Sequence, residues 1–231
     1  MQGLSREVSG LTRGDALELD HVFIFSTSNG READALVEFG LVEAPGRRHA
    51  GQGTANRTFH FENGYLEIIW VADHAELTSE RVSPTGLWER ANYLASGWSP
   101  FGLCVVNTLE ADPLFRGCVA YQPEYFPDGQ VIEIAQSVAP SVFPMLFRLP
   151  RGLQGRGRPP APVHPVGASR ISHLEFGVTT KGAIASPFDL LAPKSWVSFT
   201  SSQRSTLTLR LDERRQGKTR AFEHLPFTIE Y

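Results

Sequence analysis

The stretch TANRTFHFENGYLEIIWV, from Thr54 to Val71, predicts two β-strands joined by the turn ENG. Upstream, LDHVFIF at residues 19–25 is apolar on both faces, which is typical of a strand buried on both sides. Between these segments, apolar residues recur at helical spacing up to Gly40, and a short strand is expected at residues 41–43. The pattern therefore predicts a β-α-β-β-β unit.

The composition is that of an ordinary soluble globular protein and not of a disordered one. Of 231 residues, 41% are apolar and 20% are charged, which is enough for one large domain or two small modules that share a core. The net charge is −3, and the one cationic stretch, RGLQGRGR, is short. Without a basic stripe, we expect no nucleic-acid partner.

Cysteine usage and hydropathy bear on the cellular setting. The two cysteines, Cys104 and Cys118, are too few for a disulfide framework. The N-terminal stretch MQGLSREVSGLTRGDA is polar and lacks the apolar segment of a signal peptide. No apolar stretch approaches the roughly 18 residues that span a bilayer. We therefore expect a cytoplasmic protein without a membrane partner.

Strands dominate the rest of the chain. Residues 1–18 are interpreted as an N-terminal extension and residues 19–72 as the first module. We expect a helical excursion and a second β-rich module over 73–150, a linker rich in proline and glycine over 151–168, and a C-terminal β-rich module over 169–231. With few helices and no βαβα alternation, the predicted fold is α+β, with large, curved, mainly antiparallel sheets.

The first module resembles the vicinal oxygen chelate superfamily, and more closely its glyoxalase-like branch. The H-x-G-x-GT-A-N loop from His49 to Asn56 is the most specific signature, and SPFGLCVV, PDG and LPFTIEY are similar to later portions of that family. The resemblance implies paired βαβββ modules whose sheets curl around a central cavity. It also implies a divalent metal, often held by the first and last strands of two modules. Members include isomerases, lyases, ring-opening dioxygenases and binding proteins, so the fold alone does not choose an activity.

Two polar side chains stand at the ligand positions that this resemblance implies, His21 on the first strand and Glu67 on the fourth. Period-two counting places His21 on one face with Phe23, and Glu67 on one face with Ile69. An imidazole and a carboxylate that project into one cavity suit Zn²⁺, Mn²⁺, Ni²⁺ or Fe²⁺. The alternative to a metal site is a hydrogen bond between His21 and Glu67, in a cavity whose polar groups are all hydrogen-bonded. Asp20 is expected to point to the opposite face and to serve the entry of the strand.

The other half of the metal site has two interpretations. If FGLCVV begins the second module, its ligand position holds an apolar residue or glycine beside Cys104, and PMLFRL offers Arg148 in place of a carboxylate. If RISHLEFGV and LPFTIEY supply the partner strands, His173 and Glu230 complete the set, although an exposed histidine and a solvated carboxylate are the plainer interpretation. The second interpretation gives the better chemistry, with Glu230 as a catalytic carboxylate beside Glu67. The predicted metal ligands are His21, Glu67, His173 and Glu230.

The loop HAGQGTAN is predicted to line the substrate pocket. Its glycines permit close backbone approach, and Thr54 and Asn56 offer donor and acceptor groups to a ligand. We expect His49 to lie beside them, and Arg57 to act as an anion clamp. A purely structural loop is the alternative, because Asn and Gly are common loop formers.

Several aromatic residues outside the first module could cap the cavity. Trp88 and Tyr93 lie in the helical excursion together with Arg90, where helical spacing favours a packing or surface role. Tyr121 and Tyr125 in YQPEYFP have the same standing. None of them is included in the predicted site.

Three functions remain open. The first is a metal-dependent isomerase or lyase on a small oxygenated substrate, in which the ion binds two neighbouring oxygens and Glu67 or Glu230 moves the proton. The second is a ring-opening, extradiol-type dioxygenase with two His and one Glu on Fe²⁺. The third is a metal-free binding or sequestering protein. In each case we expect a small-molecule ligand, and the resemblance implies a homodimer.

Overall fold

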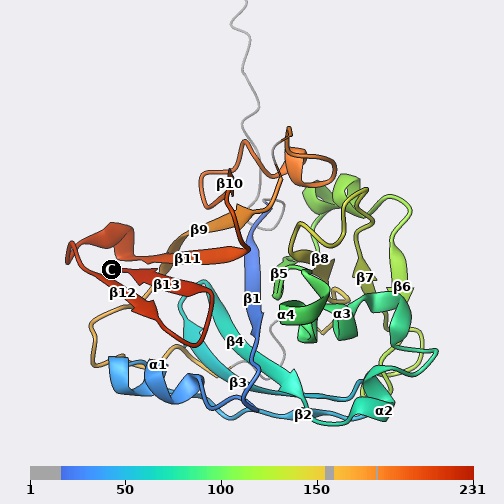
Figure 1. Cartoon of the computed structure of the whole chain (residues 1–231), viewed down its shortest axis with the longest axis horizontal. Coiled ribbons are helices and arrows are strands. Elements are labelled where there is room, and N and C mark those ends of the chain that lie inside the picture. Colours follow the sequence, from blue (N-terminus) through green and yellow to red (C-terminus); the bar gives the residue numbers. More distant parts are fainter. Residues whose placement is uncertain (1–16, 154–158, 181) are drawn as a thin grey trace, which may run out of the picture.

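Two curved β-sheets make up most of the computed structural model, which describes residues 17–153, 159–180 and 182–231 (Figure 1). Most of the predicted N-terminal extension, residues 1–16, and the centre of the predicted linker, 154–158, lie outside the described residues. Within the described ranges, no helix is both long enough and apolar enough to cross a membrane.

The larger sheet has eight strands. In spatial order they are β2 (Arg48–His49), β3 (Thr54–Phe61), β4 (Gly64–Val71), β1 (Leu19–Phe25), β5 (Phe101–Val105), β8 (Met145–Arg148), β7 (Ile132–Ile134) and β6 (Val119–Tyr121). The smaller sheet has five strands, in the order β10 (Val197–Ser201), β9 (Ile171–Val178), β11 (Thr206–Leu211), β13 (Phe227–Glu230) and β12 (Thr219–Phe222).

The larger sheet repeats one arrangement twice. In its first half, β1 lies parallel to β4, and β3 and β2 follow outward; in its second half, β5 lies parallel to β8, and β7 and β6 follow outward. Helix α1 (Ala33–Phe39) and the 3₁₀ helix η2 (Leu109–Phe115) each follow the first strand of their half. The two halves meet where β1 pairs antiparallel with β5. The predicted fold of paired βαβββ modules is confirmed, and β5 begins the second module.

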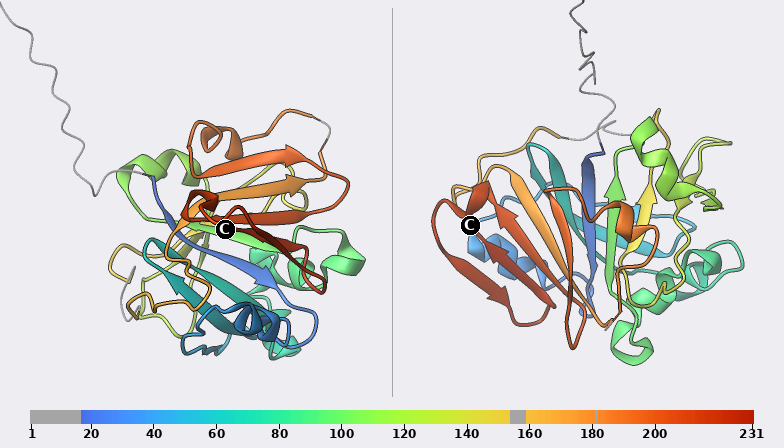
Figure 2. Two further views of the ribbon diagram at one scale, coloured as in Figure 1. Left: turned by 90° about the vertical axis from the view of Figure 1, so that its left-hand side faces the viewer. Right: turned by 90° about the horizontal axis from the view of Figure 1, so that it is seen from above.

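The segment between the two modules is helical. It forms α2 (His74–Leu77), the 3₁₀ helix η1 (Ser83–Thr85), α3 (Leu87–Ala91) and α4 (Tyr93–Ser96). Two further 3₁₀ helices, η3 (Phe188–Leu190) and η4 (Asp212–Arg214), connect strands of the smaller sheet. Figure 2 shows the smaller sheet on one side of β1 and the short helices α2 to α4 on the other.

Strand β1 separates two hydrophobic cores, because all seven of its residues are buried. Val22 and Ile24 join the core that β1 shares with the smaller sheet, where Leu174 and Phe176 of β9 lie. Phe23 and Phe25 face the other way and belong to a second core, formed with the short helices and the second module. The alternation of β1 thus sends one set of side chains to structural packing and the other set to the concave face of the larger sheet.

Gly102 on β5 is required by the ring of Phe23, which lies directly opposite it in the β1–β5 register. A Cβ atom at Gly102 would lie 2.0 Å from Cε1 of Phe23. We therefore expect Gly102→Ala to lower the free energy of unfolding by about 1–3 kcal/mol, the usual cost of overpacking a core. Urea denaturation measures the change. Gly152→Ala is the matched control, because nothing lies within 4 Å of a Cβ at that position; equal midpoints for the two variants would contradict the prediction.

Candidate functional site

A cavity lies on the concave face of the larger sheet and holds about 560 Å³ of empty space, part of it open to solvent. Its polar lining comes from the first module, with His21 on β1, His49 on β2 and Glu67 on β4. The rest is mainly apolar and comes from β1, β4, α3 and the second module: Phe23, Ile69, Leu87, Ile132, Ile134, Met145, Phe147 and Leu149.

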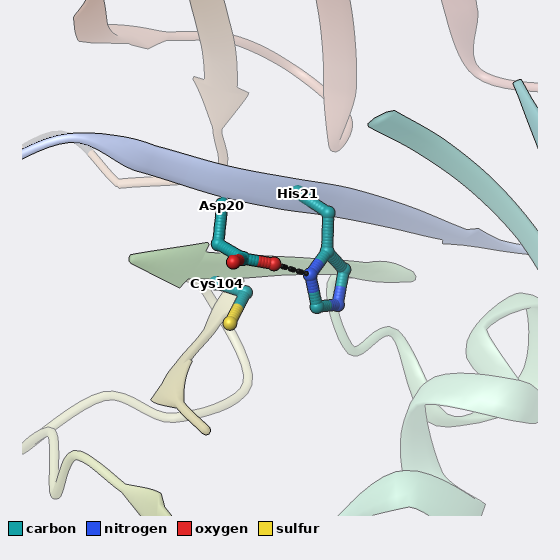
Figure 3. A group of neighbouring side chains, drawn as sticks. All are labelled: Asp20, His21 and Cys104. Carbon is teal, nitrogen blue, oxygen red and sulfur yellow. Dashed lines mark hydrogen bonds and ion pairs between the residues drawn. The ribbon is translucent and has the colours of Figure 1, made fainter. Parts of the chain in front are cut away.

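Asp20 lies on the same side of β1 as His21, because the β1–β5 register shifts between Leu19 and His21 (Figure 3). Its Oδ1 atom is 2.6 Å from Nδ1 of His21, and both residues are buried. The expectation that Asp20 faces away from the site is wrong, since strict alternation fails at an irregularity of this kind. The contact favours the tautomer with its proton on Nδ1, which leaves the lone pair of Nε2 for the cavity.

The Glu67 carboxylate lies between the two histidines. Its Oε2 atom is 3.7 Å from Nε2 of His21, and its Oε1 atom is 4.0 Å from Nε2 of His49. Oε1 also accepts a hydrogen bond of 2.6 Å from Nδ2 of Asn56. Glu67 is only 5% exposed, so the hydrogen bond from Asn56 replaces part of what water would otherwise provide to the carboxylate.

The HAGQGTAN loop holds His49 in place through a chain of hydrogen bonds. Nδ1 of His49 lies 2.8 Å from Oγ1 of Thr54, and Gln52 donates to the same oxygen. The Tyr125 hydroxyl donates in turn to Oε1 of Gln52. Burial lowers the pKa of His49 to about 4, against a smaller opposing effect of Glu67, so His49 is neutral near pH 7.

Gly53 explains why this loop needs glycine. Its φ is +80°, and a Cβ atom there would lie 2.3 Å from the carbonyl oxygen of Asp73. The carbonyl of Gly53 accepts hydrogen bonds from the backbone N–H groups of Ala72 and Asp73. The loop is therefore fastened to the segment after β4, which fixes His49 on one side of it and Thr54 on the other.

Three of the four predicted pocket residues lie at the site, and the fourth does not. His49 lines the cavity, Asn56 holds Glu67, and Thr54 holds His49. Arg57 points to the other face of β3 and forms ion pairs with Glu43 and Asp34, and the hydrogen bond to Glu43 raises its pKa. The predicted anion clamp at Arg57 is therefore not supported, because consecutive residues of a strand face opposite sides.

The second predicted pair of ligands lies elsewhere. His173 is on β9 and Glu230 on β13, both in the smaller sheet. The ring nitrogens of His173 lie 2.8 Å from the Ser195 carbonyl and from the Ser198 hydroxyl, and Glu230 accepts a hydrogen bond from Arg210. The structure does not bring either residue to the cavity, so the four-residue set is not assembled and Glu230 has no place in the chemistry of this site.

The second module contributes no carboxylate or imidazole at the positions that match His21 and Glu67. On β5 the residues facing the cavity side are Gly102 and Cys104, and on β8 they are Met145 and Phe147. Arg148 faces away and donates hydrogen bonds to Glu133 and Asp112. Among the described residues, the one group of three potential ligand side chains with donor atoms within 4.8 Å of each other is Asp20, His21 and Cys104 (Figure 3).

Four residues that line the cavity were not among the predicted site residues: Arg47, Gln52, Tyr121 and Tyr125. The sequence contains a pattern that points to Arg47: it stands two residues before His49, and residues two apart in an extended strand share a face. Its guanidinium lies 5.5 Å from the centre of the Tyr125 ring, at the mouth of the cavity. The two tyrosines were considered as caps of the cavity and left out of the predicted site, because the sequence does not show the curvature of the sheet that brings them there.

The burial of His49 predicts a pH-dependent stability in chelator-treated protein. The folded-state pKa is about 4 and the ordinary value is 6.5, so the unfolded chain binds the proton first as the pH falls. The contribution of neutral His49 is complete above pH 6.5 and is lost between pH 6.5 and 4, by at most roughly 3 kcal/mol. Urea unfolding across this range should show a shallower decline for His49→Gln. The matched control is His224→Gln at an exposed histidine, and an equal slope in the His49 variant and the wild type would contradict the assignment.

Comparison with known proteins agrees with this architecture. The sequence matches the family model described as a glyoxalase-like domain over residues 19–191. No curated protein gives a significant sequence match. A hypothetical protein from Staphylococcus aureus has a similar fold, with a TM-score of 0.55 and 8% identity over 93% of this chain and 99% of that chain.

Two further solved structures match part of the chain. A hypothetical protein from Bacillus halodurans C-125 has a TM-score of 0.38 and 12% identity over 58% of this chain and 94% of that chain. A methylmalonyl-CoA epimerase from Streptomyces coelicolor has a TM-score of 0.36 and 16% identity, over 58% of this chain and 99% of that chain. Because the family model covers most of the sequence and the paired modules are present, this chain belongs to the glyoxalase-like domain family of the vicinal oxygen chelate superfamily.

Proposed function

We propose that this protein is a metal-dependent isomerase or lyase that moves a proton on a small oxygenated substrate in the cavity. The observation that carries the proposal is the arrangement around Glu67. Two imidazoles, each held at Nδ1 by another side chain, direct their Nε2 atoms to one buried carboxylate. A cytoplasmic setting and a homodimer stay predictions.

The donor set fits a divalent ion. When Nδ1 of His21 donates to Asp20, its Nε2 atom carries a lone pair and therefore faces the Glu67 carboxylate as a second acceptor. Two acceptors that face each other repel, and a proton or a cation bound between them removes this repulsion. Neutral imidazole and carboxylate ligands suit Zn²⁺, Mn²⁺, Fe²⁺ or Ni²⁺. Partners at Nδ1 such as Asp20 and Thr54 are the usual supports of metal-binding histidines. We assign His21, His49 and Glu67 as the residues that would hold the ion.

Each residue of the site has its own role in the proposed proton transfer. When bound, the ion supplies a Lewis acid that polarises a substrate oxygen and so acidifies the neighbouring C–H bond. Asn56 fixes Oε1 of Glu67, and Oε2 faces the cavity as the acceptor of the substrate proton. Asp20 is a positioning residue that sets the tautomer and orientation of His21. The apolar walls exclude water and strengthen these interactions.

A metal-free binding protein is the second candidate, and one observation favours it. The second module places Gly102, Cys104, Met145 and Phe147 where a symmetric site would carry ligands. In that case the cavity of the first module would keep its polar network, and the substrate would be held without being changed. A ring-opening dioxygenase uses the same two histidines and one carboxylate on Fe²⁺, and oxygen consumption with the ferrous protein separates it from the isomerase or lyase.

Metal content tests the proposal directly. We expect about one divalent ion per chain after incubation with Zn²⁺, Mn²⁺, Fe²⁺ or Ni²⁺ and gel filtration, measured by elemental analysis. His21→Ala and Glu67→Gln should both lose the ion, because each removes a ligand from a set of three.

The smaller sheet offers matched controls of the same residue types. His173→Ala and Glu230→Gln should retain the ion, since both residues lie outside the cavity. An ion-free wild-type protein under all four conditions would leave the binding protein as the function. An ion that persists in both cavity variants would contradict the assigned ligands.

Proton transfer is tested with a substrate-like ketone that carries two neighbouring oxygens, 2-hydroxyacetophenone. In D₂O the metal-loaded protein should accelerate the loss of the methylene proton signal in the NMR spectrum. Glu67→Gln should slow this exchange by about a hundredfold or more, because it removes the proposed proton acceptor together with a ligand of the ion. Glu230→Gln should keep the wild-type rate; equal rates for wild type and Glu67→Gln would exclude Glu67 as the base.

A further inference from the structure

Tyr121 carries a polar group that the proposed chemistry does not use. It is the last residue of β6, is 3% exposed and lines the cavity. Among the described residues, none makes a hydrogen bond to its hydroxyl. Burial raises the pKa of Tyr121 to about 12, so the hydroxyl keeps its proton and can act as a donor near pH 7. A buried hydroxyl of this kind requires an explanation, because native proteins satisfy nearly all such groups.

The neighbouring Tyr125 shows the contrast. Its hydroxyl donates a hydrogen bond of 2.8 Å to Oε1 of Gln52, within the chain of contacts that holds His49. Both tyrosines line the same cavity and come from the same YQPEYFP segment. Tyr125 thus has a structural partner for its hydroxyl, whereas Tyr121, which lines the same cavity, has none among the described residues.

Tyr121 reaches the cavity from the second module, whereas the proposed reaction centre belongs to the first. It pairs with Ile132 on β7, at the outer edge of the second module, and packs in the core that contains Leu87 and Phe147. The charged groups that act on its hydroxyl are Arg81, Glu124 and Glu76. The cavity therefore combines the polar group around Glu67, walls of aromatic and aliphatic side chains, and a hydroxyl of the second module that has no hydrogen-bond partner among the described residues.

We propose that the substrate has an aromatic body, with its reacting oxygens at the His21–His49–Glu67 end and a further acceptor oxygen bound by the Tyr121 hydroxyl. This inference rests on the proposed function, to which it adds the substrate class. Phe23 and Phe147 supply ring surfaces for such a body, and the Tyr121 donor, which comes from the second module, fixes its direction. A site that hydrogen-bonds a substrate oxygen discriminates against the analogue that lacks it.

The probes are a matched pair of ketones, 2-hydroxyacetophenone and 2,4′-dihydroxyacetophenone, which differ in one oxygen at the far end of the ring. Titration calorimetry at slightly acidic pH, where the phenol is neutral, gives the two dissociation constants for each variant of the full chain. The wild type should bind the dihydroxy compound about three- to tenfold more tightly, as one hydrogen bond allows. Tyr121→Phe should remove this advantage and leave the affinity for 2-hydroxyacetophenone within about twofold.

Tyr125→Phe is the matched control, because it removes a hydroxyl from the same cavity that already has a protein partner. It should keep the wild-type ratio of the two dissociation constants. A wild-type ratio of one, the absence of binding by either ketone, or an equal weakening of both ketones in Tyr121→Phe would overturn the inference.

The inference and the proposed function fail separately in these experiments. A ratio that depends on Tyr121, in a protein that takes up no metal and exchanges no proton, supports the substrate class and contradicts the enzyme. Metal uptake and Glu67-dependent exchange with a ratio of one support the enzyme and contradict the role of Tyr121.

Discussion

The contact between Asp20 and His21 is the constraint on which the rest of the site depends. A buried imidazole and a buried carboxylate on adjacent strands are stable only when their polar atoms are satisfied, since desolvation is costly for both. Asp20 satisfies one side of His21 at a shift in strand register, and Asn56 satisfies one oxygen of Glu67. The other polar atoms of these two groups, Nε2 of His21 and Oε2 of Glu67, are directed at the cavity. The irregularity in β1 is thus the feature that converts a core strand into one wall of a site.

The sequence predicted the first module well because its signals are local. Alternation, the ENG turn and the glycine loop each act over a few residues, and in the structure His21, Glu67 and His49 line one cavity. The prediction failed for His173 and Glu230 because alternation identifies the face of a strand and not the sheet it joins. The second module was harder to recognise, since its inner strands carry glycine, cysteine and apolar residues at the corresponding positions.

The two modules have diverged in what they contribute to the cavity. The first supplies the polar groups, fastened by a loop in which Gly53 is required. The second supplies apolar walls, the Gly102 on which the Phe23 ring packs, and two tyrosines with different hydrogen-bond status. This division predicts a substrate that reacts at one end and is recognised along its length. A symmetric metal site with ligands from both modules would leave less room for such a body.

The central claim is that the ion is held by His21, His49 and Glu67. Anomalous diffraction from crystals soaked in Zn²⁺ locates the ion without reference to any substrate. The account predicts a single strong peak in the cavity, within ligand distance of Nε2 of both histidines and of the Glu67 carboxylate. A peak between Asp20, Nδ1 of His21 and Sγ of Cys104, or no peak in the cavity at all, would contradict it.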